Sequence, residues 1–337
     1  MSHQHWLDFY DPGSSRRFIA LIRYAPELPP RPLPNPELKA QRVEWIWQNY
    51  LAHICRKDWL VDDTLPCLDM FTGTELFAEA FGCKVYRPDD NYPFAIPFVN
   101  SAAEADKLSV PSLDAPPLRL ALEMADELQR RSGPGTLFRL VDAQSPMDVA
   151  ALIWEKASFY PALIESPEAV MCLASKIQQL QFNFFDEWFK RYGTEFIAHY
   201  PEYYMPQGIS LSVDEIGAVS RRMFDQFFLP ELEAFSERYG ALGMHSCATN
   251  RHQWENIKKI PRLRLLNFNR PEAELRQAYP LFAELVPQWH FGWDPNPDTL
   301  EDWVSQLPPH AKVVIDMTAS TKEQALDLSE RLQRITS

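Results

Sequence analysis

The chain has 337 residues, a formal net charge of −13 at pH 7, and 46% hydrophobic and 13% aromatic residues. A chain of this length buries a large core, and its acidic balance disfavours nucleic-acid partners. It has no apolar stretch of the roughly 18 residues that span a membrane, nor the pattern of a secretory signal at its start. These properties predict a cytoplasmic enzyme with no membrane partner. The 5 cysteines are odd in number and scattered, which predicts free thiols.

Proline clusters near the N-terminus. Six prolines occur at positions 26, 29, 30, 32, 34 and 36, and each restricts its own φ and the conformation of its predecessor. The cluster predicts an extended segment before a helix that begins near Glu37. Such an arm would either wrap a partner subunit or lie along its own domain. We expect residues 1–60 to form this N-terminal helical and extended arm.

Beyond the arm, short apolar runs alternate with amphipathic stretches, a rhythm typical of βα units. The predicted strands are Leu65–Met70, Thr136–Asp142, Tyr203–Ser210, Gly240–His245, Leu263–Phe268, Val286–Phe291 and Lys312–Asp316. A further strand could lie in Lys84–Val99, where three prolines weaken the prediction. Eight parallel strands with outer helices would form a (β/α)8 TIM barrel, of the α/β class, over residues 61–337.

Two stretches between the strands have helical periodicity. Phe71–Phe81 and Pro167–Tyr192 place apolar residues three and four positions apart. The second is rich in aromatic residues. This richness indicates packing against the barrel core, and a cofactor wall is the alternative.

The tripeptide His245-Ser246-Cys247 follows one predicted strand. Residues two positions apart on a strand point to the same face. An imidazole nitrogen and a thiolate sulfur side by side are suitable zinc ligands. The tripeptide therefore predicts part of a metal site.

Two strand ends carry further polar side chains. Asp214 could act as a general acid whose pKa the neighbouring Glu215 sets, although Ser212 and Glu215 also fit a helix-capping box. Gln144 and Ser145 follow another predicted strand. They could donate hydrogen bonds to a substrate, or Ser145 could only cap the next helix.

Several short motifs follow one another along the chain: FTGTE at 71–75, AEAFG at 78–82, EADKL at 104–108, QSPMD at 144–148, ESPE at 165–168, SLSVDEIG at 210–217 with Phe224, Phe227 and Pro230, and HSC at 245–247. In this order they resemble the uroporphyrinogen decarboxylase-like superfamily, which includes zinc-dependent methylcobamide:thiol methyltransferases.

The resemblance implies a (β/α)8 barrel, often a homodimer, with its pocket at the C-terminal strand ends. Methyltransferase members bind zinc through a His-x-Cys pair and a cysteine near the last strand. His245 and Cys247 match that pair, but no cysteine follows Cys247. Asp316 or His290 would then complete the shell. Decarboxylating members carry an N-terminal arginine-rich loop, which this chain lacks, and this argues against a porphyrinogen substrate.

The resemblance therefore favours a methyltransferase that moves a methyl group between a corrinoid on a partner protein and a small thiol or related acceptor. Its expected catalytic residues are Asp214, His245 and Cys247. Substrate contacts are expected from Gln144, Ser145, Tyr204, Gln207, Glu215 and Trp293. Two alternatives stay open: a metal-independent decarboxylase or lyase with Asp214 as proton donor, and a noncatalytic barrel that binds a small molecule.

Overall fold

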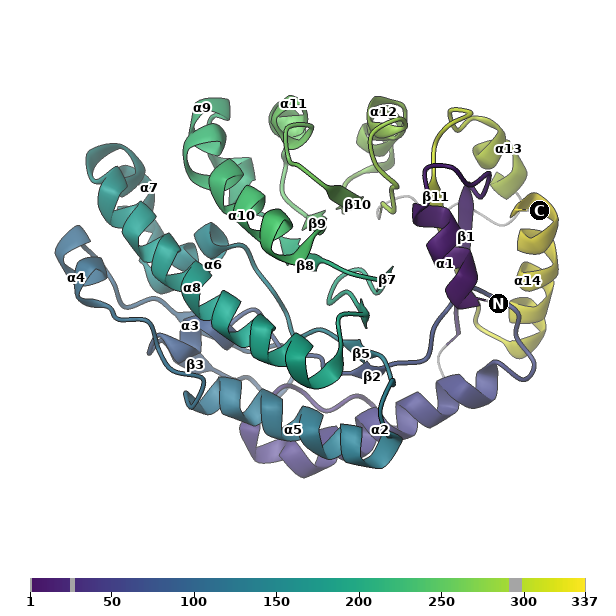
Figure 1. The fold of residues 1–337 in the computed structure, drawn as a ribbon, viewed down its shortest axis with the longest axis horizontal. Coiled ribbons are helices and arrows are strands. Elements are labelled where there is room, and N and C mark those ends of the chain that lie inside the picture. Colours follow the sequence, from purple (N-terminus) through teal and green to yellow (C-terminus); the bar gives the residue numbers. More distant parts are fainter. Residues whose placement is uncertain (1, 25–27, 291–298, 337) are drawn as a thin grey trace.

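The computed structural model describes residues 2–24, 28–290 and 299–336. It is an α/β fold in which helices surround a row of mainly parallel strands (Figure 1). The strands are β1 Phe18–Arg23, β2 Leu68–Asp69, β3 Lys84–Tyr86, β4 Phe94–Ile96, β5 Phe138–Arg139, β6 Phe196–Ile197, β7 Tyr204–Met205, β8 Ile209–Ser212, β9 Leu242–Ser246, β10 Leu263–Phe268 and β11 Val313–Thr318.

The helices include long amphipathic segments and several single turns. The α-helices are α1 Ser2–Tyr10, α2 Lys39–Arg56, α3 Leu76–Ala80, α4 Ala102–Lys107, α5 Pro116–Ser132, α6 Pro146–Ile153, α7 Lys156–Glu165, α8 Pro167–Tyr192, α9 Arg221–Met223, α10 Leu229–Tyr239, α11 Trp254–Ile257, α12 Glu272–Phe282, α13 Leu300–Ser305 and α14 Lys322–Thr336. Short 3-10 turns are η1 Pro36–Leu38, η2 Glu215–Ala218 and η4 Arg251–Gln253, and Phe224–Phe228 is a π-helical turn. Within the described residues, every helix is too short or too polar to cross a membrane.

The parallel strands form one continuous row. β2 pairs with β5, a bridge from Gln144 to Ser212 leads to β8, and β8 pairs with β9 and β9 with β10. Gln288 then bridges β10 to β11, which pairs with β1. Among the described residues no hydrogen-bonded ladder joins β1 to β2, so the expected barrel is not closed at this point.

Two carboxylates satisfy the open edge of β1. Asp63 accepts the backbone N–H of Ala20 at 2.8 Å and donates its own N–H to the Ala20 carbonyl at 2.8 Å. Asp62 accepts the N–H of Ile22 at 3.2 Å. Both acids are buried, and buried N–H groups need acceptors. Side chains therefore supply the acceptors that a neighbouring strand would otherwise provide.

Most of the predicted strands are confirmed, with shifted ends. β10 has the predicted bounds, while β2, β5, β9 and β11 overlap their predicted ranges. The run 286–291 contributes only the bridging residue Gln288, and Phe291 lies outside the described residues.

One predicted strand is absent from the parallel row, and one strand of the row was not predicted. Lys84–Val99 holds no barrel strand, because β3 and β4 pair antiparallel as a separate hairpin. The remaining barrel strand is β1, which the sequence analysis did not predict and which lies within the expected arm. The division into an arm of residues 1–60 and a barrel of residues 61–337 stays a prediction.

The range 203–210 is two strands and not one. β7 pairs antiparallel with β6, and β8 starts only at Ile209. Between them Gly208 has φ +131°, and a Cβ there would lie 2.7 Å from the Ala241 carbonyl oxygen. A glycine is therefore required where the chain turns into β8.

The aromatic helix packs in the core. α8 has the predicted bounds, and Phe184, Phe185 and Trp188 are fully buried. The Trp188 ring meets Phe138 of β5 edge-on at 5.7 Å. These contacts favour core packing over a cofactor wall.

The described part of the proline segment, residues 28–36, contacts its own domain. The indole of Trp45 on α2 donates to the Pro29 carbonyl at 2.8 Å, and Arg31 pairs with Asp69 at 3.1 Å. Of the two expected roles, these contacts correspond to a segment that lies along its own domain.

Replacement of Asp63 tests the capped edge. Asp63→Ala leaves the buried Ala20 N–H without its acceptor, so we expect the free energy of unfolding to fall by about 1–3 kcal/mol. Urea denaturation followed by circular dichroism measures the change. The exposed Asp58 is the matched control, and Asp58→Ala should leave the midpoint unchanged. Equal midpoints for the two variants would contradict the role of Asp63.

Candidate metal centre

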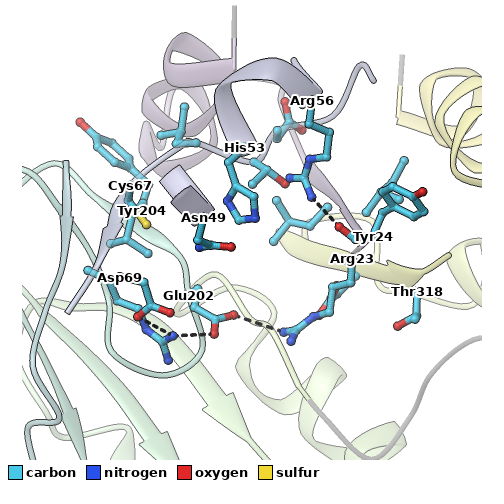
Figure 2. A pocket seen from close by; sticks show the side chains of 18 of the residues that line it. Arg23, Tyr24, Asn49, His53, Arg56, Cys67, Asp69, Glu202, Tyr204 and Thr318 are labelled. Carbon is cyan, nitrogen blue, oxygen red and sulfur yellow. Dashed lines mark hydrogen bonds and ion pairs between the residues drawn. The ribbon is translucent and has the colours of Figure 1, made fainter. Parts of the chain in front are cut away.

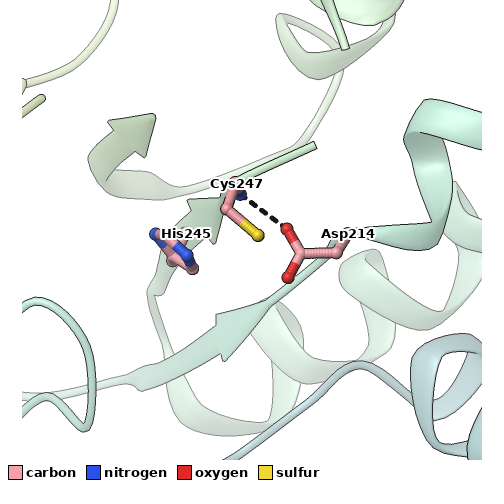
Figure 3. A group of neighbouring side chains, drawn as sticks. All are labelled: Asp214, His245 and Cys247. Carbon is pink, nitrogen blue, oxygen red and sulfur yellow. Dashed lines mark hydrogen bonds between the residues drawn. The ribbon is translucent and has the colours of Figure 1, made fainter. Parts of the chain in front are cut away.

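The end of β9 and the segments that follow β8 and β9 bring three potential ligands together. One donor atom each from Asp214, His245 and Cys247 lies within 4.8 Å of the other two (Figure 3). Carboxylate oxygen, imidazole nitrogen and thiolate sulfur are all donors that zinc accepts, with bonds of about 2.0–2.3 Å. Such bonds require a closer approach, and rotation of the Asp214 and Cys247 side chains, which are not buried, permits it.

Strand register aligns the groups around this cluster. Ser212 of β8 and Asn267 of β10 both lie opposite His245 of β9, and Gln144 lies opposite Ser212. Four polar residues thus occupy one level across adjacent strands.

A hydrogen-bonded chain orients the imidazole of His245. The amide nitrogen of Asn267 donates to the Trp289 carbonyl, so its oxygen faces Nδ1 of His245 and accepts the proton there. Nε2 is left with a free lone pair. Burial lowers the pKa of His245 more than Asp214 and Asn267 raise it, so the ring is neutral at pH 7. A neutral ring whose second nitrogen is hydrogen-bonded is typical of metal-ligating histidines.

The loop that carries Asp214 is held by Asp148 at the start of α6. The buried Asp148 carboxylate accepts the backbone N–H of Asp214 at 2.7 Å and of Glu215 at 2.9 Å. Gly217 then passes close to the next loop, because a Cβ there would lie 2.7 Å from Ala248. The two loops are therefore held against each other at the cluster.

The Cys247 thiol lies beside a carboxylate. Its backbone N–H donates to Asp214 at 2.6 Å. Partial desolvation of the sulfur, followed by the charge of Asp214, raises the pKa of the Cys247 thiol to about 12. Without a cation the sulfur is therefore protonated at neutral pH, and a cation would reverse this preference.

A cavity of about 180 Å³ adjoins the cluster. Gln144, Asp214 and His245, which were expected to share a pocket, all line it. Asp142 also lines it, and burial raises the pKa of this carboxyl to about 6. The amide of Gln144 donates to Asp142.

Three further residues of this cavity were missed from the sequence. His199 donates or accepts through Nε2 with Ser212 at 2.9 Å, and Tyr200 meets the His245 ring edge-on at 4.5 Å. The buried Arg139 donates to the His199 carbonyl at 3.0 Å. The run Phe196–Ala198 before His199 has the pattern of a strand end, but the predicted strand began only at Tyr203.

Asp316 and His290 are not in the cluster. Asp316 accepts from Arg23 at 2.6 Å and lines a different cavity. His290 accepts the Phe268 N–H through Nδ1 at 2.9 Å and pairs through Nε2 with Gln288 at 2.9 Å. Both nitrogens of His290 are thus occupied, and burial lowers its pKa to about 3. The third potential ligand is Asp214.

Two expected substrate contacts have local structural roles. Glu215 is bound by Lys156 and Tyr160, away from the cavity. The buried Ser145 caps α6 by accepting from the Asp148 N–H at 3.2 Å. The proposed capping box is also corrected, because the cap of η2 comes from Asp148 and not from Ser212.

The other expected contacts lie elsewhere. The Tyr204 hydroxyl pairs with Glu195 at 2.9 Å, and the ring lines the second cavity. Gln207 is exposed in the turn before β8. Trp293 lies outside the described residues.

Comparison with known proteins points to one family and one fold. A family model described as Uroporphyrinogen decarboxylase (URO-D) matches residues 67–271. No curated protein matches the chain. A solved methyltransferase from Methanosarcina mazei superposes with a TM-score of 0.65 over 98% of this chain and 96% of its own, at 11% identity. At this identity the likeness shows a shared fold alone.

Two structures of the homocysteine methyltransferase MmuM from Escherichia coli are more distant. The apo form covers 50% of this chain and 87% of its own with a TM-score of 0.22, and the metallated form covers 80% and 97% with 0.29. Both are 14% identical, and such scores support no argument.

Alkylation of Cys247 tests the influence of Asp214. In chelator-treated protein at about pH 8, the pH is well below the raised pKa of the Cys247 thiol. The thiol is therefore mostly protonated and should react slowly with iodoacetamide. Asp214→Asn removes one cause of the raised pKa, so the rate should increase by about threefold or more. Mass spectrometry of the labelled peptides measures the rate. The exposed Cys172 in the same molecule is the control, and an unchanged Cys247 rate would contradict the coupling.

Proposed function

The chain belongs to the uroporphyrinogen decarboxylase family, as the motifs indicated, and we propose that it is a zinc-dependent methyltransferase within it. The methyl group would pass from a corrinoid carrier to a small thiol. The observation that carries the proposal is the grouping of Asp214, His245 and Cys247 within 4.8 Å. Three protein donors leave a fourth position of a tetrahedral zinc open for a substrate.

The donor set fits zinc on two grounds. His245 presents a neutral nitrogen that Asn267 has oriented, and oxygen, nitrogen and sulfur together suit a borderline metal better than magnesium or calcium. A bound zinc ion would lower the pKa of an acceptor thiol, so that its sulfur is a nucleophile near neutral pH.

The residues of the chain itself would position the acceptor. The cavity of about 180 Å³ beside the cluster suits a small thiol, and Gln144, His199 and Tyr200 supply polar walls. Alignment of the acceptor sulfur with the methyl carbon would increase the rate of transfer through proximity. The methyl group would leave cobalt without its bonding electron pair, and sulfur would form the new bond.

One observation argues against the decarboxylase alternative. The arginines that line the two cavities each lie within ion-pair distance of a carboxylate: Arg23, Arg31, Arg56 and Arg139. A substrate carboxylate would have to displace one of these internal partners. The methyl-transfer assay described below distinguishes a methyltransferase from the noncatalytic alternative.

Zinc content tests the ligand set. Protein purified without chelator should contain one zinc per chain, and His245→Ala, Cys247→Ala and Asp214→Ala should each lose it. Elemental analysis measures the content, and circular dichroism verifies that each variant is folded. Cys172→Ala and His290→Gln are the matched controls and should retain zinc. A parent protein that binds no zinc after reconstitution would refute the proposal.

The pH dependence of zinc affinity follows from two pKa shifts. His245 is already neutral because burial lowers its pKa, whereas Cys247, with a pKa of about 12, must release a proton on binding. Affinity should therefore rise by about tenfold per pH unit between about pH 6 and 8. Competition with a chromophoric chelator measures it. In Cys247→Ala, any residual binding should lose this dependence.

Asn267 should act as a positioning residue. Asn267→Leu removes the acceptor of the His245 Nδ1 proton, and we expect zinc affinity to fall by about 10- to 100-fold. Asn267→Asp keeps the acceptor and should restore most of the affinity. Equal affinity in Asn267→Leu and the parent would show that the imidazole needs no such support.

Methyl transfer itself is measured with methylcobalamin and 2-mercaptoethanol. Loss of the methylcobalamin absorbance should require zinc and His245. If the protein binds zinc but transfers no methyl group, the proposed metal centre is supported, and methylcobalamin and 2-mercaptoethanol are rejected as its carrier and acceptor.

A further inference from the structure

A second and larger cavity is lined by residues of α2, β1 and β2. Its volume is about 420 Å³ (Figure 2). Pockets of this size bind small molecules. None of the three residues of the metal cluster lines it, and only Arg139 lines both this cavity and the smaller one.

Two polar side chains of α2 point into this cavity. Asn49 and His53 lie four residues apart, hence on one face of the helix, and Figure 2 shows both turned toward the space above Glu202. Within the described part of the chain, neither side chain makes a hydrogen bond, although Asn49 is only 8% exposed. The Asn49 amide therefore faces the cavity itself. A ligand in the cavity could supply hydrogen-bond partners.

The charges around the cavity are internally balanced. Four arginines and four carboxylates line it. Arg139 pairs with Asp69 at 3.1 Å and with Glu202 at 3.1 Å, and Arg23 pairs with Asp316 at 2.6 Å. An ion would enter without a counter-charge of its own, and desolvation of an unpaired charge is unfavourable.

The remaining polar groups are neutral and the walls carry large rings. Burial lowers the pKa of His53 to about 4, so its imidazole is uncharged at pH 7. Burial also raises the pKa of the Cys67 thiol, which therefore stays protonated. The partly exposed Tyr24 and Trp45 contribute ring surface to the lining. Indole faces favour flat apolar groups.

We infer that this cavity is a binding site for an uncharged, planar small molecule that carries a carboxamide or a similar donor and acceptor pair at one edge. The Asn49 amide matches such an edge with one donor and one acceptor. His53 offers a third hydrogen bond. The inference rests on the cavity alone, and it goes beyond the proposed function because it needs neither zinc nor methyl transfer.

Three isosteric probes test the inference. Benzamide, benzoate and benzamidinium have the same shape and differ in charge. At pH 7, in chelator-treated protein, benzamide should bind at least about tenfold more tightly than either ion. Ligand-detected NMR titration measures the three dissociation constants. Preference for benzoate or benzamidinium, or no binding of benzamide, would overturn the inference.

Variants of α2 locate the site. Asn49→Leu preserves the approximate shape of the side chain and should weaken benzamide binding by about threefold to tenfold, the loss expected for one or two neutral hydrogen bonds. His53→Leu provides an independent second variant. Gln48→Leu is the matched control, because Gln48 is exposed on the same helix.

Two outcomes distinguish this site from the metal centre. His245→Ala should bind benzamide like the parent, since His245 does not line the larger cavity. Unchanged binding in both Asn49→Leu and His53→Leu, with folded proteins, would overturn the inference. Loss of binding in His245→Ala would place benzamide at the metal centre and would also overturn it.

Discussion

The register of the parallel strands is the constraint on which the candidate site depends. Parallel pairing places Gln144, Ser212, His245 and Asn267 at one level. Because strand side chains alternate between faces, a slip of one residue in β9 would turn His245 away from Asn267. The side chains of β8 and β9 are buried along their whole length, and burial of this kind specifies the register. The same pairing therefore fixes the core and the site.

Buried polar groups then set the protonation of the site. Asp148 and Glu231 are buried near the start of α6, and burial raises the pKa of each. Asp148 nevertheless receives two backbone N–H groups, which hold the η2 loop in place. In this low-dielectric setting, a hydrogen bond both orients a group and selects its proton state. In the same way, the hydrogen bond from His245 Nδ1 to Asn267 orients the imidazole and selects its tautomer.

The sequence predicted the long periodic elements well. α8 and β10 were found with their observed bounds, since packing and local periodicity agree there. β1 was missed because its run Phe18–Ile22 is apolar without alternation and precedes a proline cluster that suggested an arm. Gln288 was expected within a strand but makes only isolated bridges.

Parts of the site could be predicted, but its final partners could not. His245 and Cys247 are close in sequence, and strand periodicity alone places them together. Asp214 lies in the loop after another strand, β8, and its proximity depends on Asp148, Gly217 and the register of β8 with β9. Asp316 was a reasonable substitute ligand on chemical grounds, but Arg23 pairs with it. Such tertiary competition for a carboxylate leaves no local sequence signal.

The pairing of β1 with β11 has a consequence for how the protein reaches its native state. β1 lies near the start of the chain and its partner near the end, and Figure 1 shows the two elements side by side. During synthesis, Phe18–Arg23 emerges from the ribosome long before Val313–Thr318 exists. β1 therefore cannot form this ladder until β11 has been synthesised, although Asp62 and Asp63 can cover its other edge earlier. Such non-local pairing slows folding. The parallel ladder of β1 therefore depends on the presence of β11.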